Sequence, residues 1–116
     1  MFCHVDEEYV LGIPDVKSIY QVPLILEEQK LSILLQKRLS LFKDGIERVP
    51  MLDSWKEMTK KVELLEQQKE GIHIALVGKY TGLSDSYLSI IKSLQHASYV
   101  VEKKLIIDWV NSEHLE

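Results

Sequence analysis

A phosphate-binding loop is the first chemistry that the sequence suggests, at Gly78-Lys79-Tyr80-Thr81-Gly82. The segment follows a predicted strand and precedes a predicted helix, where backbone N–H groups and a helix N-terminus can bind an anion. A P-loop has a glycine five residues before its Gly-Lys pair and Ser or Thr directly after it, whereas this chain has His73 and Tyr80 there. The glycine pattern of dinucleotide-binding proteins is missing too. Lys79 is therefore a candidate phosphate ligand by position alone.

A second candidate is the turn formed by Pro14, Asp15 and Val16. It comes just after residues 9–13, an apolar, β-branched run that predicts a buried strand. Open α/β sheets form ligand crevices at the carboxyl ends of their strands. Asp15 can equally cap a short helix carrying Ile19 and Tyr20, because its carboxylate accepts N–H bonds. The residues alone leave both roles open.

Metal ions and covalent catalysis find little support. No two of the four histidines are four residues apart, as zinc-binding pairs on a helix are. Cys3, the only cysteine, adjoins His4, but catalytic dyads are usually assembled from distant segments. Consecutive carboxylates at residues 6–8 are typical of a solvated turn. We expect no metal ligand and no catalytic residue in this chain.

The elements that would position these residues follow from hydrophobic spacing. Leucines and isoleucines recur at helical intervals from Pro23 to Leu39, which predicts a helix. Residues 43–50 have the turn-forming and mixed-charge composition of a connector, so we place a domain boundary there. A linker helix is predicted to start at Asp53 as its cap and to end near Gly71.

The last third of the chain predicts one parallel β-α-β unit. Residues 72–77 read as a strand covered on both faces, Ser84 opens a helix, and residues 105–110 form the next strand. The predicted fold class is thus α/β: a short strand with helices, a linker helix and a β-α-β unit. Because a two-stranded sheet is marginally stable in water, we expect a fragment of a larger protein.

Composition restricts the partners. Fourteen basic and 18 acidic residues give a net charge of −4, and the sequence has no basic patch, so nucleic acid is not expected as a partner. No apolar run approaches the roughly 18 residues that a membrane span needs. A single cysteine and the lack of a secretory signal favour the reducing cytoplasm.

Three stretches together resemble the CTP synthase family in its eukaryotic form. They are Met1-Phe2-Cys3-His4-Val5, then Asp15-Val16-Lys17-Ser18-Ile19-Tyr20-Gln21-Val22-Pro23-Leu24-Ile25-Leu26-Glu27-Glu28-Gln29, then Ala75-Leu76-Val77-Gly78-Lys79-Tyr80-Thr81 with Ser84-Asp85-Ser86-Tyr87. The resemblance implies a ligase that phosphorylates UTP with ATP and Mg and aminates it to CTP, taking ammonia from glutamine. It also implies a cytoplasmic homotetramer in pyrimidine biosynthesis.

The resemblance also implies a domain division. Residues 1–42 would be the tail of the amidoligase (synthetase) domain, residues 43–70 the interdomain linker, and residues 71–116 the start of a Rossmann-like class I glutamine amidotransferase domain. The family's phosphate loop, magnesium carboxylates and UTP lysines would lie before Met1, and its Cys-His-Glu triad after Glu116. Neither catalytic centre falls within this chain, which we expect to be inactive alone.

By the same resemblance, the adenine-side ATP contacts fall on Pro14, Asp15 and Val16. Pro14 departs from many members, so Asp15 and Val16 carry this assignment. Phe2 corresponds to an aromatic residue near the pyrimidine nucleotide. Leu88 and Lys92 stand where bacterial members have a lysine and a glutamate proposed to serve the effector GTP, so no GTP role is carried over.

Two other functions compete with the ligase segment. One is an α-rich interaction module without catalysis, and the other is a truncated receiver-like domain, which explains only residues 72–110. A glutaminase sequence after Glu116 and a phosphate loop before Met1 in the source transcript would favour the ligase.

Overall fold

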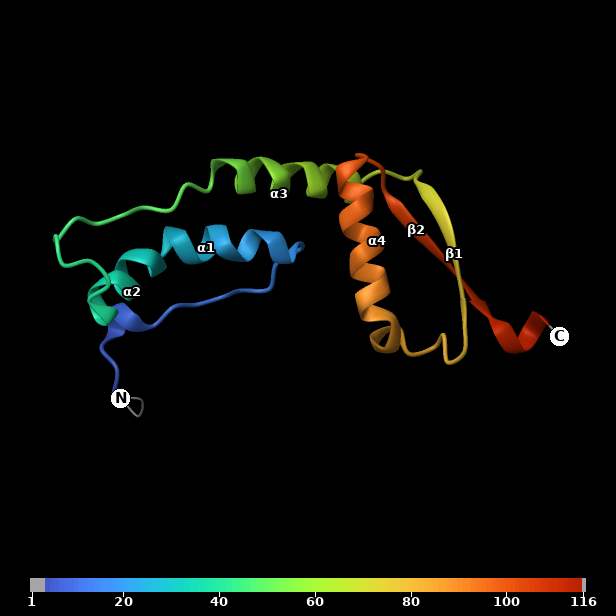
Figure 1. The fold of residues 1–116 in the computed structure, drawn as a ribbon, viewed down its shortest axis with the longest axis horizontal. Coiled ribbons are helices and arrows are strands. Elements are labelled where there is room, and N and C mark those ends of the chain that lie inside the picture. Colours follow the sequence, from blue (N-terminus) through green and yellow to red (C-terminus); the bar gives the residue numbers. More distant parts are fainter. Residues whose placement is uncertain (1–3, 116) are drawn as a thin grey trace. The chain divides into compact units, whose positions relative to one another are not determined.

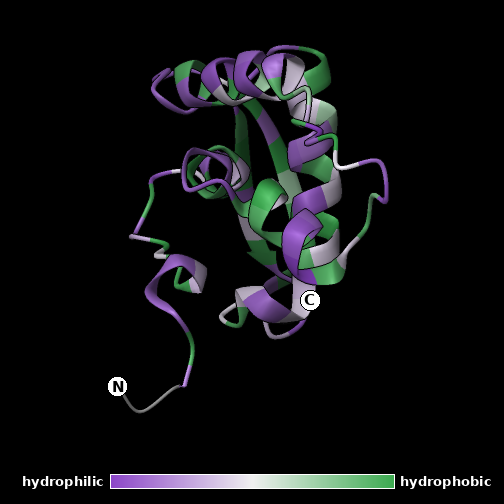
Figure 2. Cartoon of the chain, turned by 90° about the vertical axis from the view of Figure 1, so that its left-hand side faces the viewer, coloured by the Kyte–Doolittle hydropathy of each residue, from purple (hydrophilic) through white to green (hydrophobic). Residues whose placement is uncertain are grey.

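The computed structural model describes residues 4–115 of the chain. These residues divide into two compact units, Met1–Thr59 and Lys60–Glu116, which are described separately. Figure 1 traces the elements in chain order, and hydrophobic and hydrophilic residues alternate along the helices (Figure 2). No helix in the described part of the chain combines the length and apolar character needed to cross a membrane.

The first unit is mainly helical. Its elements are η1 (Glu7–Tyr9), η2 (Ile19–Gln21), α1 (Val22–Glu28) and α2 (Leu31–Leu39). Pro23 occupies the first turn of α1, where its missing N–H costs nothing. The predicted helix from Pro23 to Leu39 is broken at Lys30, which has a φ of 63°. Hydrophobic spacing did not show this break, because leucines and isoleucines recur at helical intervals on both sides of Lys30.

The predicted buried strand at residues 9–13 is wrong. Val10 and Ile13 are 65% and 57% exposed, and η1 occupies the start of the run. A strand needs a hydrogen-bonding partner along its length, and within residues 4–115 the only sheet is formed by two strands of the second unit. An apolar β-branched run without such a partner stays irregular.

The helix predicted to start at Asp53 is confirmed as α3 (Asp53–Glu66), and residues 43–50 before it are irregular. Its predicted end near Gly71 is several residues too late. The Lys104 Nζ atom donates to the carbonyl oxygens of Glu66 at 2.8 Å and of Gln68 at 2.7 Å. A cation that binds terminal carbonyls stabilises the C-terminus of a helix, so a residue distant in sequence sets this end.

The second unit contains the predicted parallel β-α-β. Its elements are β1 (Ile72–Gly78), η3 (Ser84–Tyr87), α4 (Leu88–Val100), β2 (Leu105–Asn111) and η4 (Ser112–Leu115). The two strands pair in parallel from Ile72 opposite Leu105 to Gly78 opposite Asn111, and α4 packs against β2. The α/β class and the order of these elements are confirmed.

The buried apolar core described here is small. Val62, Leu65 and Leu76 are less than 9% exposed, and all three lie in the second unit. By contrast, Ile72 and Val77 of β1 are 42% and 54% exposed. Within residues 4–115, two strands and one helix leave these apolar residues open to solvent, as expected for a fragment of a larger sheet, and cover on both faces stays a prediction for the complete sheet.

Gly71 permits a close backbone approach at the start of the sheet. A Cβ atom at this position would lie 2.3 Å from the carbonyl oxygen of Lys104, which accepts the Ile72 N–H at 2.8 Å. Because the obstructing atom belongs to the backbone, a side chain here must displace β1 from β2.

We expect Gly71→Ala to destabilise the chain by about 1 to 3 kcal/mol, the usual cost of overpacking. Gly82→Ala is the control, because no atom lies within 4 Å of its added Cβ, and its effect should stay within about 0.5 kcal/mol. Urea unfolding of both variants checks this. Equal losses of stability would show that the approach of Gly71 to Lys104 does not matter.

An ion pair links α3 to Glu102, two residues after the end of α4. The Lys61 Nζ atom lies 2.9 Å from Glu102 Oε1, and both side chains are well exposed. Two effects of Lys61 lower the pKa of Glu102 below its ordinary value of 4.5: the hydrogen bond that it donates, which is the larger, and its positive charge. A lowered folded-state pKa means that the pair stabilises the fold above the unfolded pKa, and that this stabilisation is lost as pH falls through the folded pKa.

We expect an NMR carboxyl titration to give a Glu102 pKa below 4.5 in the native chain. In Lys61→Met this pKa should rise toward the ordinary value, because the donor and the charge are both gone. Molar salt should produce a similar rise in the native chain, since exposed pairs are screened. An identical Glu102 pKa in the native and Lys61→Met chains would contradict the pairing.

Candidate functional site

The candidate site is an irregular turn at residues 13–17, held at both ends by side chains. Before it, the Gln29 carboxamide contacts the main chain of Gly12: Oε1 accepts the Gly12 N–H and Nε2 donates to the Gly12 carbonyl oxygen, both at 2.8 Å. These two bonds reproduce what a neighbouring strand would offer. Gly12 is thereby fixed to the end of α1 without being part of a sheet.

After the turn, Ser18 and Tyr20 form the second anchor. The Ser18 hydroxyl accepts the Tyr20 N–H at 3.4 Å and caps η2. The Tyr20 carbonyl oxygen accepts from Trp55 Nε1 at 2.8 Å and from the Thr59 hydroxyl at 3.2 Å. The predicted cap at Asp15 is thus wrong: Ser18 directly precedes η2 and can reach its second N–H, whereas Asp15 lies three residues further upstream.

Asp15 and Val16 lie at the exposed part of this turn. Asp15 is exposed and Val16 is half-buried. Among the described residues, none is hydrogen-bonded to the main chain of either. Free peptide N–H and C=O groups next to an apolar side chain can bind the edge and the face of a flat heterocycle. Asp15 and Lys17 are the charged residues of this turn, both are exposed, and no observation places either of them against a reacting group.

Phe2, the candidate near the pyrimidine nucleotide, lies outside the described residues, as does Cys3.

The glycine loop at residues 78–82 is in contact with an aromatic side chain from η3. The Tyr87 hydroxyl donates to the Lys79 carbonyl oxygen, and the Tyr87 ring packs on Trp109 with centroids 5.7 Å apart. The Leu83 N–H donates to the Tyr80 carbonyl oxygen at 3.0 Å, so the loop is folded on itself. Lys79 is exposed, and no observation beyond its position supports a phosphate contact.

The helix after this loop carries the two positions compared with bacterial GTP residues. Leu88 is the first residue of α4 and is 50% exposed, and Lys92 lies one turn further along and is half-buried.

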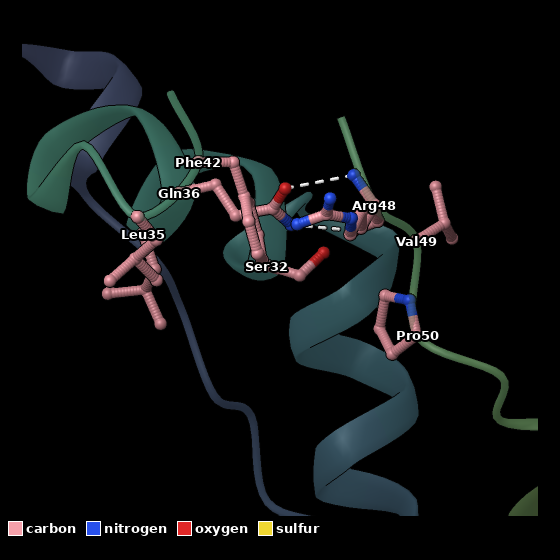
Figure 3. A pocket seen from close by; sticks show the side chains of 8 residues that line it. Ser32, Leu35, Gln36, Phe42, Arg48, Val49 and Pro50 are labelled. Atoms are coloured by element: carbon pink, nitrogen blue, oxygen red, sulfur yellow. Dashed lines mark hydrogen bonds between the residues drawn. The ribbon is translucent and has the colours of Figure 1, made fainter. Parts of the chain in front are cut away.

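A second glutamine, Gln36, contacts an extended segment in the same way. Its Oε1 accepts the Arg48 N–H at 2.9 Å and its Nε2 donates to the Arg48 carbonyl oxygen at 2.5 Å (Figure 3). The Arg48 guanidinium lies 3.8 Å from the centre of the Phe42 ring and 2.8 Å from the Asp44 carboxylate. The adjoining pocket of about 340 Å³ is lined mainly by apolar groups and holds no cluster of titratable side chains.

No group of three or more metal-ligating side chains occurs among residues 4–115. His73 pairs through Nδ1 with Asp108 Oδ2 at 2.9 Å across β1 and β2.

Sequence reasoning missed both glutamine contacts. Gln29 belongs to the stretch quoted for its family resemblance, but its partner lies 17 residues earlier in the chain. Gln36 binds a residue 12 positions later. Neither spacing corresponds to a local motif, so the sequence held no sign of these anchors.

Comparison with known proteins agrees with the resemblance. A family model described as the CTP synthase N-terminus matches residues 1–41. CTP synthase of Dictyostelium discoideum is 42% identical over all of this chain and 22% of its own length. Human CTP synthase 1 is 48% identical, over all of this chain and 19% of its own length. For CTP synthase 1 of Saccharomyces cerevisiae, the identity is 45%, again over the whole chain and 21% of that protein.

The chain thus spans about a fifth of the length of these curated relatives, and the matches include the candidate turn, α3 and the β-α-β unit. Over its whole length the chain is similar to proteins named CTP synthase, and the CTP synthase N-terminus model matches its first 41 residues.

Proposed function

We propose that the complete protein is a CTP synthase-type ligase, which uses ATP to aminate UTP to CTP with ammonia from glutamine. In this proposal the present chain supplies the adenine side of the ATP pocket and the start of the glutaminase domain. The carrying observation is the identity of 42–48% over the whole chain with relatives named CTP synthase. No observation favours the alternative of an interaction module without catalysis.

The proposed domain limits are residues 1–42, 43–70 and 71–116. The irregular connector at residues 43–50 followed by α3 supports a linker, and β1 begins at Ile72, where the glutaminase domain would start. Parallel pairing of β1 with β2 supports a Rossmann-like unit, since such folds are built from parallel β-α-β repeats. We further propose a cytoplasmic homotetramer for the complete protein.

At the ATP pocket, Asp15 and Val16 would bind adenine, with Pro14 beside them. Their unpaired peptide groups can accept from and donate to the edge of the base, and the half-buried Val16 side chain can cover its face. Neither residue takes part in phosphoryl or ammonia transfer. In this proposal the ligands of Mg²⁺ belong to the rest of the complete protein. Phe2 stays a proposed contact of the pyrimidine nucleotide.

A chimeric enzyme tests this function. In human CTP synthase 1, the aligned stretch is replaced by the 116 residues of this chain. We expect the chimera to form CTP from UTP, ATP and glutamine, and the isolated chain to release neither CTP nor glutamate, because it lacks both catalytic centres. A chimera that melts like human CTP synthase 1 but forms no CTP would contradict the proposal, as would glutaminase activity in the isolated chain.

Val16→Asp in the chimera tests the adenine contact. A poorly paired carboxylate against the base costs about 1 to 3 kcal/mol, so we expect a tenfold or greater rise in the KM for ATP. Glutamine hydrolysis should persist. Val10→Asp is the matched control, because Val10 is 65% exposed on the same irregular segment, and it should leave the ATP dependence unchanged.

Steady-state CTP formation against ATP concentration and the melting temperature separate a binding role from a structural one. If Val16 only supports the fold, Val16→Asp lowers the melting temperature and weakens both half-reactions together. An unchanged KM for ATP in a folded variant would end the assignment of the turn.

A further inference from the structure

We propose that Gln29 is a positioning residue for ATP: its carboxamide fixes Gly12 and thereby holds the turn at residues 13–17 in the shape that receives adenine. This inference rests on the proposed function and adds to it a residue that does not touch the nucleotide. Its basis is the pair of 2.8 Å hydrogen bonds between the Gln29 carboxamide and the Gly12 main chain.

The orientation of the Gln29 carboxamide is well determined. Its Nε2 also donates to the Ile25 carbonyl oxygen at 3.2 Å, so both amide hydrogens and one oxygen lone pair are used. A flipped amide would place the Gln29 oxygen against the carbonyl oxygens of Gly12 and Ile25. The carboxamide therefore joins α1 to Gly12 in one arrangement.

The hold on Gly12 reaches Asp15 through a stiff stretch of backbone. Pro14 fixes its own φ near −65°, and Ile13, as the residue before a proline, is confined to extended conformations. Only these two residues separate Gly12 from Asp15. On the other side, Ser18 caps η2 and the Tyr20 carbonyl oxygen is held by Trp55 and Thr59.

Loss of the Gln29 contact would leave the turn anchored at one end. Its peptide groups would then sample many orientations, and ATP would have to select the competent one. The apparent affinity falls by the fraction of competent conformers. Because Gln29 does not contact the reacting groups, turnover at saturating ATP should stay the same.

Gln36 provides a matched control. It makes the same pair of contacts with a main-chain segment, at Arg48, and lies in α2 of the same unit. Figure 3 shows its carboxamide facing the Arg48 backbone beside the apolar pocket. Removing the Gln36 side chain loses bonds of the same type from a segment distant in sequence from the turn.

The first measurement uses the 116-residue chain, without reference to activity. Amide hydrogen exchange at Gly12 should accelerate in Gln29→Ala and stay unchanged in Gln36→Ala. Exchange at Arg48 should accelerate in Gln36→Ala and stay unchanged in Gln29→Ala. Unchanged exchange at Gly12 in Gln29→Ala would overturn the proposal, because the contact would then not hold the main chain.

The second measurement uses the chimeric enzyme. In Gln29→Ala we expect the KM for ATP to rise roughly five- to tenfold, the effect of losing one or two ordinary hydrogen bonds. The kcat and the KM for UTP should stay within twofold. Gln29→Glu keeps the size and one acceptor but loses both donors and sets a charged oxygen against the carbonyl oxygens of Gly12 and Ile25, so the KM for ATP should rise at least as much. Gln36→Ala should leave the KM for ATP unchanged at a similar melting temperature.

The outcomes distinguish failure of the positioning role of Gln29 from failure of the proposed function on which it rests. An active chimera in which Gln29→Ala leaves the KM for ATP unchanged, or lowers kcat and raises all KM values together, overturns the positioning role alone. An unsubstituted chimera that folds but forms no CTP and binds no ATP by calorimetry overturns the proposed function, and the positioning role with it.

Discussion

At several points of the first unit, side chains bind main-chain polar groups that lie outside helices and sheets. None of the described residues of this unit is a buried hydrophobic one, and its most buried residue described is Thr59, at 3% exposed. Gln29 holds Gly12, Gln36 holds Arg48, and Trp55 with Thr59 holds the Tyr20 carbonyl oxygen. With so little apolar burial, the path of the irregular segments depends on these directional contacts.

The second unit uses the same device at fewer points. The Lys104 side chain donates to the carbonyl oxygens of Glu66, the last residue of α3, and of Gln68 just beyond it, and the Lys104 carbonyl oxygen accepts the first N–H of β1. One residue therefore sets both the end of a helix and the start of a sheet. The parallel pairing of β1 and β2 does the rest, with Leu76 buried and Ile72 still 42% exposed.

Predictions from the sequence succeeded where the periodicity of apolar residues determines the secondary structure. The strands β1 and β2 and the helix α3 follow from apolar spacing and flanking turn residues, which are local properties. The predictions failed where a distant partner decides. Residues 9–13 have the composition of a strand but no strand beside them, and the end of α3 depends on Lys104. Ser18, rather than Asp15, caps η2, because the helix begins later than apolar spacing indicated.

The candidate turn shows why such a site is hard to derive from its own residues. If adenine is bound through peptide groups, many different side chains at position 15 would allow binding. The residues that must then be kept are those that fix the backbone of the turn. Those residues are an amide at Gln29, a hydroxyl at Ser18 and an indole at Trp55, spread from position 18 to position 55. None has the charge or nucleophilicity by which functional side chains are usually recognised. A backbone-built site is thus encoded in its anchors, and only the folded chain shows that the anchors meet on one turn.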